Sequence, residues 1–190
     1  GWGTQLEHYF DSSLTVKNLA LSGRSSKSYV QEEQYQTLMQ GMKAGDYLFV
    51  GFGHNDEKAD ERRYTNPNGN YLTEGSFANS LYVNYVKPAQ EKGVTVVLCT
   101  PIVRRTATGI WEDSNLHITS DSGEFEGGNY AEAIRKMGED LDITVVDMTT
   151  LTKNLYDELG VDETLNLHAW TSSSGTSVDN THTNIYGARY

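Results

Sequence analysis

Residues Val94–Thr100 read Val-Thr-Val-Val-Leu-Cys-Thr, a nearly unbroken run of apolar and β-branched side chains. Comparable runs lie at Thr15–Leu21, Tyr47–Phe52 and Ile143–Met148, and three of the four are almost continuously apolar. Continuous apolar runs are typical of strands that are buried on both faces of a parallel sheet, because a strand with one solvated face alternates. The four runs therefore predict the strands of a parallel sheet.

Segments with apolar residues at helical spacing separate these runs. They lie at Ser26–Met42, Gly75–Lys92, Tyr130–Leu141 and Leu151–Leu159, and the second and fourth are followed by the glycines Gly93 and Gly160. A glycine at this place is a common helix C-cap. The alternation predicts a single α/β domain, a doubly wound sheet with right-handed crossovers and helices on both faces.

The size and charge of the chain limit its partners. Its 190 residues suffice for one domain with a substantial core. With 15 Lys and Arg against 26 Asp and Glu, the net charge is −11, so a nucleic acid would be repelled at long range. An acidic polysaccharide would be repelled too, unless basic residues cluster at its site. No apolar run approaches the roughly 20 residues that span a bilayer, so no membrane partner is expected.

The cysteine and two of the histidines give little information about function. Cys99 is the only cysteine, so no internal disulfide can form, and its apolar run favours a buried, inert thiol. Cysteine usage therefore does not settle the cellular compartment. His117 and His168 have no partner at metal-ligand spacing, so we assign them no role and expect no metal or cofactor.

The first segment with recognisable chemistry is Asp179-Asn-Thr-His182. Asp and His three residues apart can share one turn at a helix start, where the carboxylate orients the imidazole as in the base half of a Ser-His-Asp triad. An Asp that caps a helix beside a surface His fits the motif equally well. The pair is therefore a candidate catalytic base only in combination with other signals.

Two glycine-containing turns supply those signals. Gly51-Phe-Gly-His-Asn-Asp56 directly follows a predicted strand, at the edge where α/β folds place their sites, and Asn55 could aim its amide N–H at a developing oxyanion. In Asn18–Ser26 a strand leads into a turn, where Gly23 can offer a backbone N–H. The alternatives are an ordinary turn and a plain strand–helix connection with Ser25 as N-cap.

Taken in order, these three segments resemble the blocks of the SGNH (GDSL-like) hydrolases, whose fold is a flavodoxin-like three-layer α/β/α sandwich. Gly23 matches the second block, Gly53-x-Asn55-Asp56 the third, and Asp179-x-x-His182 the last. The resemblance implies that Gly23 and Asn55 form the oxyanion hole. It also implies that His182 is the general base and that Asp179 orients it.

The exact residues of five short stretches resemble those of the rhamnogalacturonan acetylesterase branch of that family. The matching stretches are Gly1-Trp-Gly3, Gly23-Arg-Ser-Ser-Lys-Ser28, Phe52-Gly-His-Asn-Asp56, Cys99-Thr-Pro101 and Asp179-Asn-Thr-His-Thr183. The resemblance implies a serine esterase that needs no cofactor and deacetylates plant cell-wall polysaccharide, either pectin (rhamnogalacturonan) or xylan. It further implies a secreted bacterial protein, monomeric when complete. Two rivals stay open: a non-catalytic carbohydrate-binding relative and an SGNH lipase or thioesterase.

One block of the family has no match in these residues. The family's Gly-Asp-Ser block, which carries the nucleophile, lies upstream of the Gly-Trp-Gly motif, and this sequence opens at that motif. Gly45-Asp46 is followed by Tyr47 and cannot replace it. In the family strand order 2-1-3-4-5, the absent strand would lie between Thr15–Leu21 and Tyr47–Phe52. We therefore expect 1–190 to be one SGNH domain that lacks the nucleophile strand and most of the last helix, and to be inactive alone.

Basic residues flank the expected site. Long polar segments at Glu57–Glu74, Arg104–Gly128 and His168–Asn180 are of a length that is usually functional or mobile. Their candidate substrate-binding residues are Arg62, Arg63, Arg104, Arg105 and Trp170. Arginines could bind uronic-acid carboxylates, and Trp170 or Trp111 could stack on a sugar ring. The alternatives are salt bridges to Glu57, Asp60 or Glu61, and tryptophans that pack their own loops.

Overall fold

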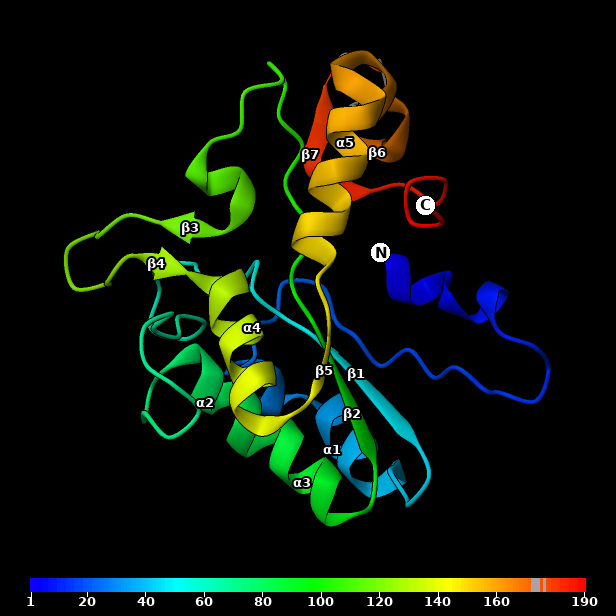
Figure 1. The fold of residues 1–190 in the computed structure, drawn as a ribbon, viewed down its shortest axis with the longest axis vertical. Helices are drawn as coiled ribbons and strands as arrows, with labels where there is room; N and C mark the ends of the chain where they lie inside the picture. The colour runs from blue at the N-terminus through cyan, green and yellow to red at the C-terminus, as the bar shows by residue number, and fades with distance from the viewer. Residues whose placement is uncertain (172–174, 176) are drawn as a thin grey trace.

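A parallel three-stranded sheet lies at the centre of the molecule (Figure 1). The computed structural model describes residues 1–171, 175 and 177–190, so part of the predicted polar segment His168–Asn180 lies outside the described residues. The strands are β1 (Tyr47–Gly51), β2 (Thr95–Cys99) and β5 (Thr144–Val146), in the order β1-β2-β5. Phe49 pairs with Val97, and Val97 pairs with Thr144. Three of the four predicted runs are thus confirmed as parallel strands.

The fourth run, Thr15–Leu21, is not a strand, and this prediction was wrong. It follows two 3₁₀ turns, Trp2–Thr4 and Leu6–Tyr9, as an extended segment. No backbone hydrogen bond joins it to β1 within the described part of the chain. A strand needs a ladder partner for its N–H and C=O groups, and no described segment pairs with Thr15–Leu21. The outer edge of β1 is likewise unpaired by the described residues.

The helices follow the predicted segments closely. Helix α4 (Tyr130–Leu141) has the predicted bounds, and α1 (Glu33–Gly41) fills the second half of its segment after a 3₁₀ turn. Gly75–Lys92 becomes α2 (Phe77–Leu81), a π-helical turn (Tyr82–Val86) and α3 (Lys87–Glu91). Helix α5 (Met148–Thr164) is longer than predicted, because a second helical stretch continues beyond a kink at Gly160, where φ is 76°. A 3₁₀ turn, Leu165–Leu167, follows it.

The main core lies between these helices and one face of the sheet. It contains Val96 and Leu98 of β2 together with Leu81, Tyr85 and Ile134 from the covering helices, all buried. The alternating side chains of the strands point to the opposite face, where Tyr47 and Phe49 of β1 are exposed. The 3₁₀ turn containing Trp2 approaches that face at the end of β1, beside Gly51. An α/β fold with a parallel sheet is therefore confirmed.

A smaller unit lies at the carboxyl end of the sheet (Figure 1). Strands β6 (His168–Trp170) and β7 (Val178–Thr183) pair antiparallel beside α5. A second short pair, β3 (Ile118–Thr119) and β4 (Gly128–Asn129), precedes α4. A separate small core of Val103, Tyr156 and Leu167 holds α5 to the loop after β2. None of the described helices is both long and apolar enough to cross a membrane.

Candidate active site

The Asp179–His182 pair has the geometry of a catalytic base. The Nδ1 of His182 lies 2.7 Å from the Oδ2 of Asp179. The other carboxylate oxygen accepts the N–H groups of Thr181 and His182 at 2.8 and 3.1 Å. Since Nδ1 donates its proton to the carboxylate, Nε2 of the largely exposed imidazole is left as the proton acceptor.

The charge of Asp179 is held by the same hydrogen bonds. Partial burial acts to raise the pKa of Asp179, but the bonds from Thr181 and His182 outweigh it and keep the pKa below its ordinary value. The carboxylate is therefore ionised at neutral pH and can stabilise an imidazolium. The expected helix start is absent, because both residues lie in strand β7, where the bonds from the N–H groups of Thr181 and His182 to the Asp179 side chain bring Asp179 and His182 together.

Two buried side chains hold β7 in place. Arg105 donates to Asn180 Oδ1, to Thr164 Oγ1 and to the carbonyl of Val161, and its backbone N–H donates to the carbonyl of Asn180. His168 lies between the hydroxyl of Tyr156, at 2.6 Å, and the carbonyl of Asp179, at 2.8 Å. Arg105 is therefore inside the protein, which corrects its prediction as a substrate-binding residue. His168, to which the sequence analysis assigned no role, contacts the backbone carbonyl of Asp179 and so helps to fix this residue.

The loop after β1 presents Asn55 at the carboxyl edge of the sheet. Gly53 has φ of 141°, and a Cβ built on it would lie 2.9 Å from the ring of Pro101, so only glycine fits. The Oδ1 of Asn55 accepts from Nη1 of Arg63 at 3.2 Å. This bond occupies the amide oxygen of Asn55. The Nδ2 donor of the same amide bonds no residue that the structure describes. The Asn55 amide thus keeps N–H donors that the Arg63 bond does not use, and its role in an oxyanion hole stays a prediction.

Asp56 joins this loop to the turn that carries Gly23. Its buried carboxylate accepts the N–H of Ser26 at 3.1 Å, the hydroxyl of Ser26 at 2.5 Å and the hydroxyl of Thr65 at 2.9 Å. Complete burial raises the pKa of Asp56 to about 7 in spite of these bonds. The third-block loop and the second-block turn, far apart in sequence, are therefore held together by one carboxylate.

This burial makes the stability of the folded chain depend on pH. The carboxyl of Asp56 has an ordinary pKa of 3.8 but keeps its proton up to about pH 7 when folded. Between these values the folded state binds the extra proton, so the stabilisation is full below the lower pKa and declines as pH rises to about 7. We expect urea midpoints of the wild-type protein and Asp56→Asn to diverge steadily across this window and to keep a constant difference above it. A difference that does not vary with pH would contradict the burial of an ionisable Asp56.

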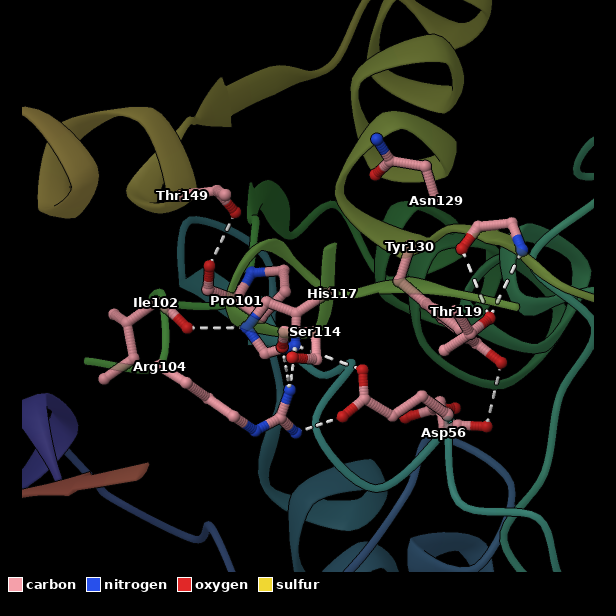
Figure 2. A network of polar contacts seen from close by, with 12 residues as sticks. Asp56, Pro101, Ile102, Arg104, Ser114, His117, Thr119, Asn129, Tyr130 and Thr149 are labelled. Atoms are coloured by element: carbon pink, nitrogen blue, oxygen red, sulfur yellow. Dashed lines mark hydrogen bonds and ion pairs between the residues drawn. The ribbon is translucent and has the colours of Figure 1, made fainter. Parts of the chain in front are cut away.

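A second polar network joins the loop after β1 to the Arg104–Gly128 loop (Figure 2). The His117 ring is fully buried, with Nε2 2.7 Å from the carbonyl of Ile102 and Nδ1 3.3 Å from both Arg104 Nη1 and Glu57 Oε2. Arg104 also forms an ion pair with Glu57. The salt-bridge alternative for Arg104 is therefore what the structure shows. His117, which the sequence left without a role, links the Arg104–Gly128 loop to the loop after β1.

His54, in the loop after β1, packs against this network. Its ring packs edge-on against His117, with ring centroids 4.3 Å apart. Burial lowers the pKa of His54 well below its ordinary value, and the charges of His117, Arg104 and His182 lower it further. His54, in the loop that carries Asn55, is therefore packed against a residue of the Arg104–Gly128 loop.

Gly23 borders a cavity rather than a flat surface. The cavity has a volume of about 300 Å³ and is lined by Gly23, Arg24, Ser28, Asp60, Arg62 and Arg63. Gly23 has φ of 75°, in the region that favours glycine. Arg63 belongs both to this lining and to the hydrogen bond with Asn55. Gly23 thus lies at this cavity with Arg62 and Arg63, and Asn55 is hydrogen-bonded to one of the lining residues, Arg63.

The tryptophans differ in their surroundings. Trp111 donates to Asp157 at 2.6 Å and lies under the ammonium group of Lys153, so it packs its own loop. Trp170, on β6, is half exposed and stays available to a ligand. Among the described residues no cluster of three or more His, Cys, Asp or Glu side chains could hold a metal ion.

A comparison with protein families decides what kind of site this is. The GDSL-like lipase/acylhydrolase family model matches residues 1–190. The chain belongs to this family. The resemblance drawn from the three blocks is therefore confirmed at the level of the family.

Individual relatives agree with the family. The chain is 33% identical to the rhamnogalacturonan acetylesterase RhgT of Bacillus subtilis over 170 residues, which cover 90% of the chain and 65% of RhgT. It is 30% identical to the rhamnogalacturonan acetylesterase of Emericella nidulans over 203 residues, covering 99% of the chain and 74% of that protein.

A solved structure supports the fold. The crystal structure of YxiM of Bacillus subtilis matches all of the chain with a TM-score of 0.74 at 24% identity, and the match covers 46% of that protein. The chain thus spans less than two thirds of RhgT and of YxiM.

Proposed function

We propose that the full-length protein is a secreted serine esterase that removes acetyl groups from a plant cell-wall polysaccharide, pectin or xylan. The observation that carries this proposal is the Asp179–His182 pair, in which the carboxylate holds Nδ1 and leaves Nε2 as the proton acceptor. Similarity to two rhamnogalacturonan acetylesterases supports the acetyl ester as the bond that is cleaved. The partner would be an acetylated poly- or oligosaccharide, and no metal or cofactor enters the mechanism.

The proposed reaction is acyl transfer through a Ser-His-Asp triad. A serine hydroxyl attacks the acetyl carbonyl while Nε2 of His182 takes its proton, and the imidazolium then protonates the sugar oxygen as the C–O bond breaks. A water molecule, deprotonated by the same nitrogen, releases acetate from the serine. Asp179, ionised and bonded to Nδ1, stabilises the imidazolium in both steps.

We place the nucleophilic serine on a strand outside residues 1–190. The open outer edge of β1 supports this, because a parallel strand added there would end beside the Gly51–Asp56 loop. The serines next to Gly23 are unsuitable. Ser25 and Ser26 are buried, and the Ser26 hydroxyl is occupied by Asp56 at 2.5 Å and Ser80 at 2.8 Å.

The oxyanion hole is proposed to consist of the Gly23 N–H and the Asn55 amide. Removing one such donor typically lowers kcat by about 10²–10³-fold. We expect Asn55→Ala to show a loss of this size with a small, neutral aryl acetate. Arg63→Ala should lower kcat less, with little change in KM, because Arg63 only turns the Asn55 amide. A loss confined to KM, in either variant, would contradict these roles.

The test of the proposed function is acetate release by the full-length protein. A panel of acetylated rhamnogalacturonan, acetylated xylan and small acetylated sugars, assayed beside long-chain acyl esters, separates a polysaccharide acetylesterase from a lipase or thioesterase. We expect acetate release from at least one polysaccharide and negligible cleavage of long-chain esters. Binding of polysaccharide without acetate release would instead identify a non-catalytic relative.

A further inference from the structure

A short helical turn of the backbone carries Asn55. The N–H groups of Asp56 and Glu57 both donate to the carbonyl of Gly53, at 3.0 and 3.2 Å. Residues three apart on such a turn are neighbours on one side of it, so His54 and Glu57 share a side. Asn55 lies between these two residues in sequence. A contact that holds both of them therefore also fixes the place of Asn55.

One buried residue, His117, contacts both flanks of Asn55. Its ring lies edge-on against the ring of His54, with centroids 4.3 Å apart, and its Nδ1 lies 3.3 Å from Oε2 of Glu57. Arg104 completes the arrangement, since its guanidinium group bonds Nδ1 of His117 and pairs with Glu57 (Figure 2). His117 comes 60 residues after Glu57 in the chain. A side chain from a distant loop thus holds the turn on both sides of Asn55.

The hydrogen bonds of His117 define the tautomer of its ring. The carbonyl of Ile102, 2.7 Å from Nε2, can only accept, so Nε2 carries the proton. Nδ1 of the neutral ring is then the acceptor for Nη1 of Arg104. The ring is completely buried, so its rotation would break both bonds in the interior, where unpaired polar groups are costly. The imidazole is therefore a rigid support for the turn.

The backbone of His117 is a second, independent indication of a role for its side chain. His117 has φ of 60° and ψ of 36°, in the left-handed region that residues other than glycine and asparagine rarely adopt. Glycine would relieve this strain but would also remove the ring. Strained backbone of this kind is concentrated at active sites, where surrounding contacts hold it in place. The strain therefore points to the position of this ring as the feature that matters.

We propose that His117 is a positioning residue for the oxyanion hole. It acts through Asn55, whose amide it keeps in one place by holding both flanks of the turn. This inference rests on the proposed function, which gives Asn55 its part in the hole. An N–H donor contributes most when it is already in place as charge develops on the substrate oxygen, because it then needs no reorganisation. A displacement of about 1 Å can cost on the order of 10²-fold in rate.

The first test is a double-mutant cycle in the full-length protein, with a small neutral aryl acetate as substrate. We expect His117→Ala to lower kcat about 10²-fold with little change in KM, because the lost interaction is one with the transition state. In the Asn55→Ala background the same substitution should lower kcat by less than about two-fold, since the donor on which it acts is already absent. Equal losses in the two backgrounds would overturn the inference.

Two further variants separate positioning from a general loss of stability. His117→Asn offers Arg104 an acceptor close to the place of Nδ1 and tolerates the left-handed backbone, so it should be about ten-fold more active than His117→Ala. Met137→Ala is the matched control, because Met137 is also buried, in helix α4 of the main core. It should lower the midpoint of urea unfolding and keep wild-type kcat. A loss of kcat in Met137→Ala as large as in His117→Ala would contradict a specific role of His117.

Hydrogen exchange tests the inference without catalysis. The amide hydrogens of Asp56 and Glu57 report directly on the turn, since both are bonded to the carbonyl of Gly53. We expect His117→Ala to speed their exchange about ten-fold in the full-length protein, as measured by mass spectrometry, and Met137→Ala to leave it near the wild-type rate. If no acetyl ester is cleaved, the proposed function fails and this measurement alone decides whether His117 orders the turn. Equal exchange in the wild type and His117→Ala would overturn that role.

Discussion

His182→Ala in the full-length protein is expected to lower kcat for acetyl-ester hydrolysis on the order of 10⁶-fold, because loss of the triad histidine removes proton transfer in both steps. The fold should survive, since the His182 side chain is largely exposed and, among the residues that the structure describes, bonds only Asp179. Initial rates of acetate release, with circular dichroism as the check on folding, measure both expectations. His8→Ala changes another exposed histidine, in the 3₁₀ turn Leu6–Tyr9, and should retain wild-type kcat.

Asp179→Ala should be less damaging, on the order of 10⁴-fold in kcat, because Asp179 orients and charges the base without accepting the proton. This variant also frees the N–H groups of Thr181 and His182, so the turn in β7 loses its internal acceptor. Asp179→Asn restores one acceptor for these groups and separates the two effects. Full activity of His182→Ala, or a larger loss for Asp179→Asn than for His182→Ala, would refute the assignment of the triad.

The second large effect concerns residues 1–190 produced by themselves. We expect this segment to release no measurable acetate, a loss again on the order of 10⁶-fold relative to the full-length protein. The two buried serines after Gly23 are not placed to attack, since Ser25 bonds Ser28 and Ser26 bonds Asp56. Acetate release by the segment and by the full-length protein, at equal concentration and with the same acetylated substrate, checks this.

The segment is also expected to be unstable. The edge of β1 is unpaired by the described residues, and Tyr47 and Phe49 are exposed beside it, a combination that favours aggregation. Size-exclusion chromatography and a urea titration of the segment would show this directly. Rapid acetyl-ester hydrolysis by a monomeric segment would place the nucleophile within residues 1–190 and would contradict the proposed serine.

The local sequence pattern predicts well those helices and strands whose stabilising contacts come from residues close in the sequence. Helix α4 begins after Asn129, whose side chain accepts the N–H of Glu132, and its apolar face is buried in the core. Strands β1 and β2 follow from continuous apolar runs. Local pattern could not decide Thr15–Leu21, because a strand exists only where another strand completes its hydrogen bonds. Its β-type residues were a correct signal of extended backbone but not of pairing.

The site divides in the same way. The sequence by itself determined the residue types and their spacing, Gly23, Asn55, Asp179 and His182, because the turns and short-range bonds that they need are local. Only the tertiary structure decided the partners of the charged side chains: Arg105 bonds Asn180 of β7, Arg104 bonds Glu57 and His117, and Arg63 bonds Asn55. The physical reason is that an ion pair or a buried hydrogen bond depends on which distant segments come into contact in the fold. The spacing of residues along the sequence does not indicate those contacts.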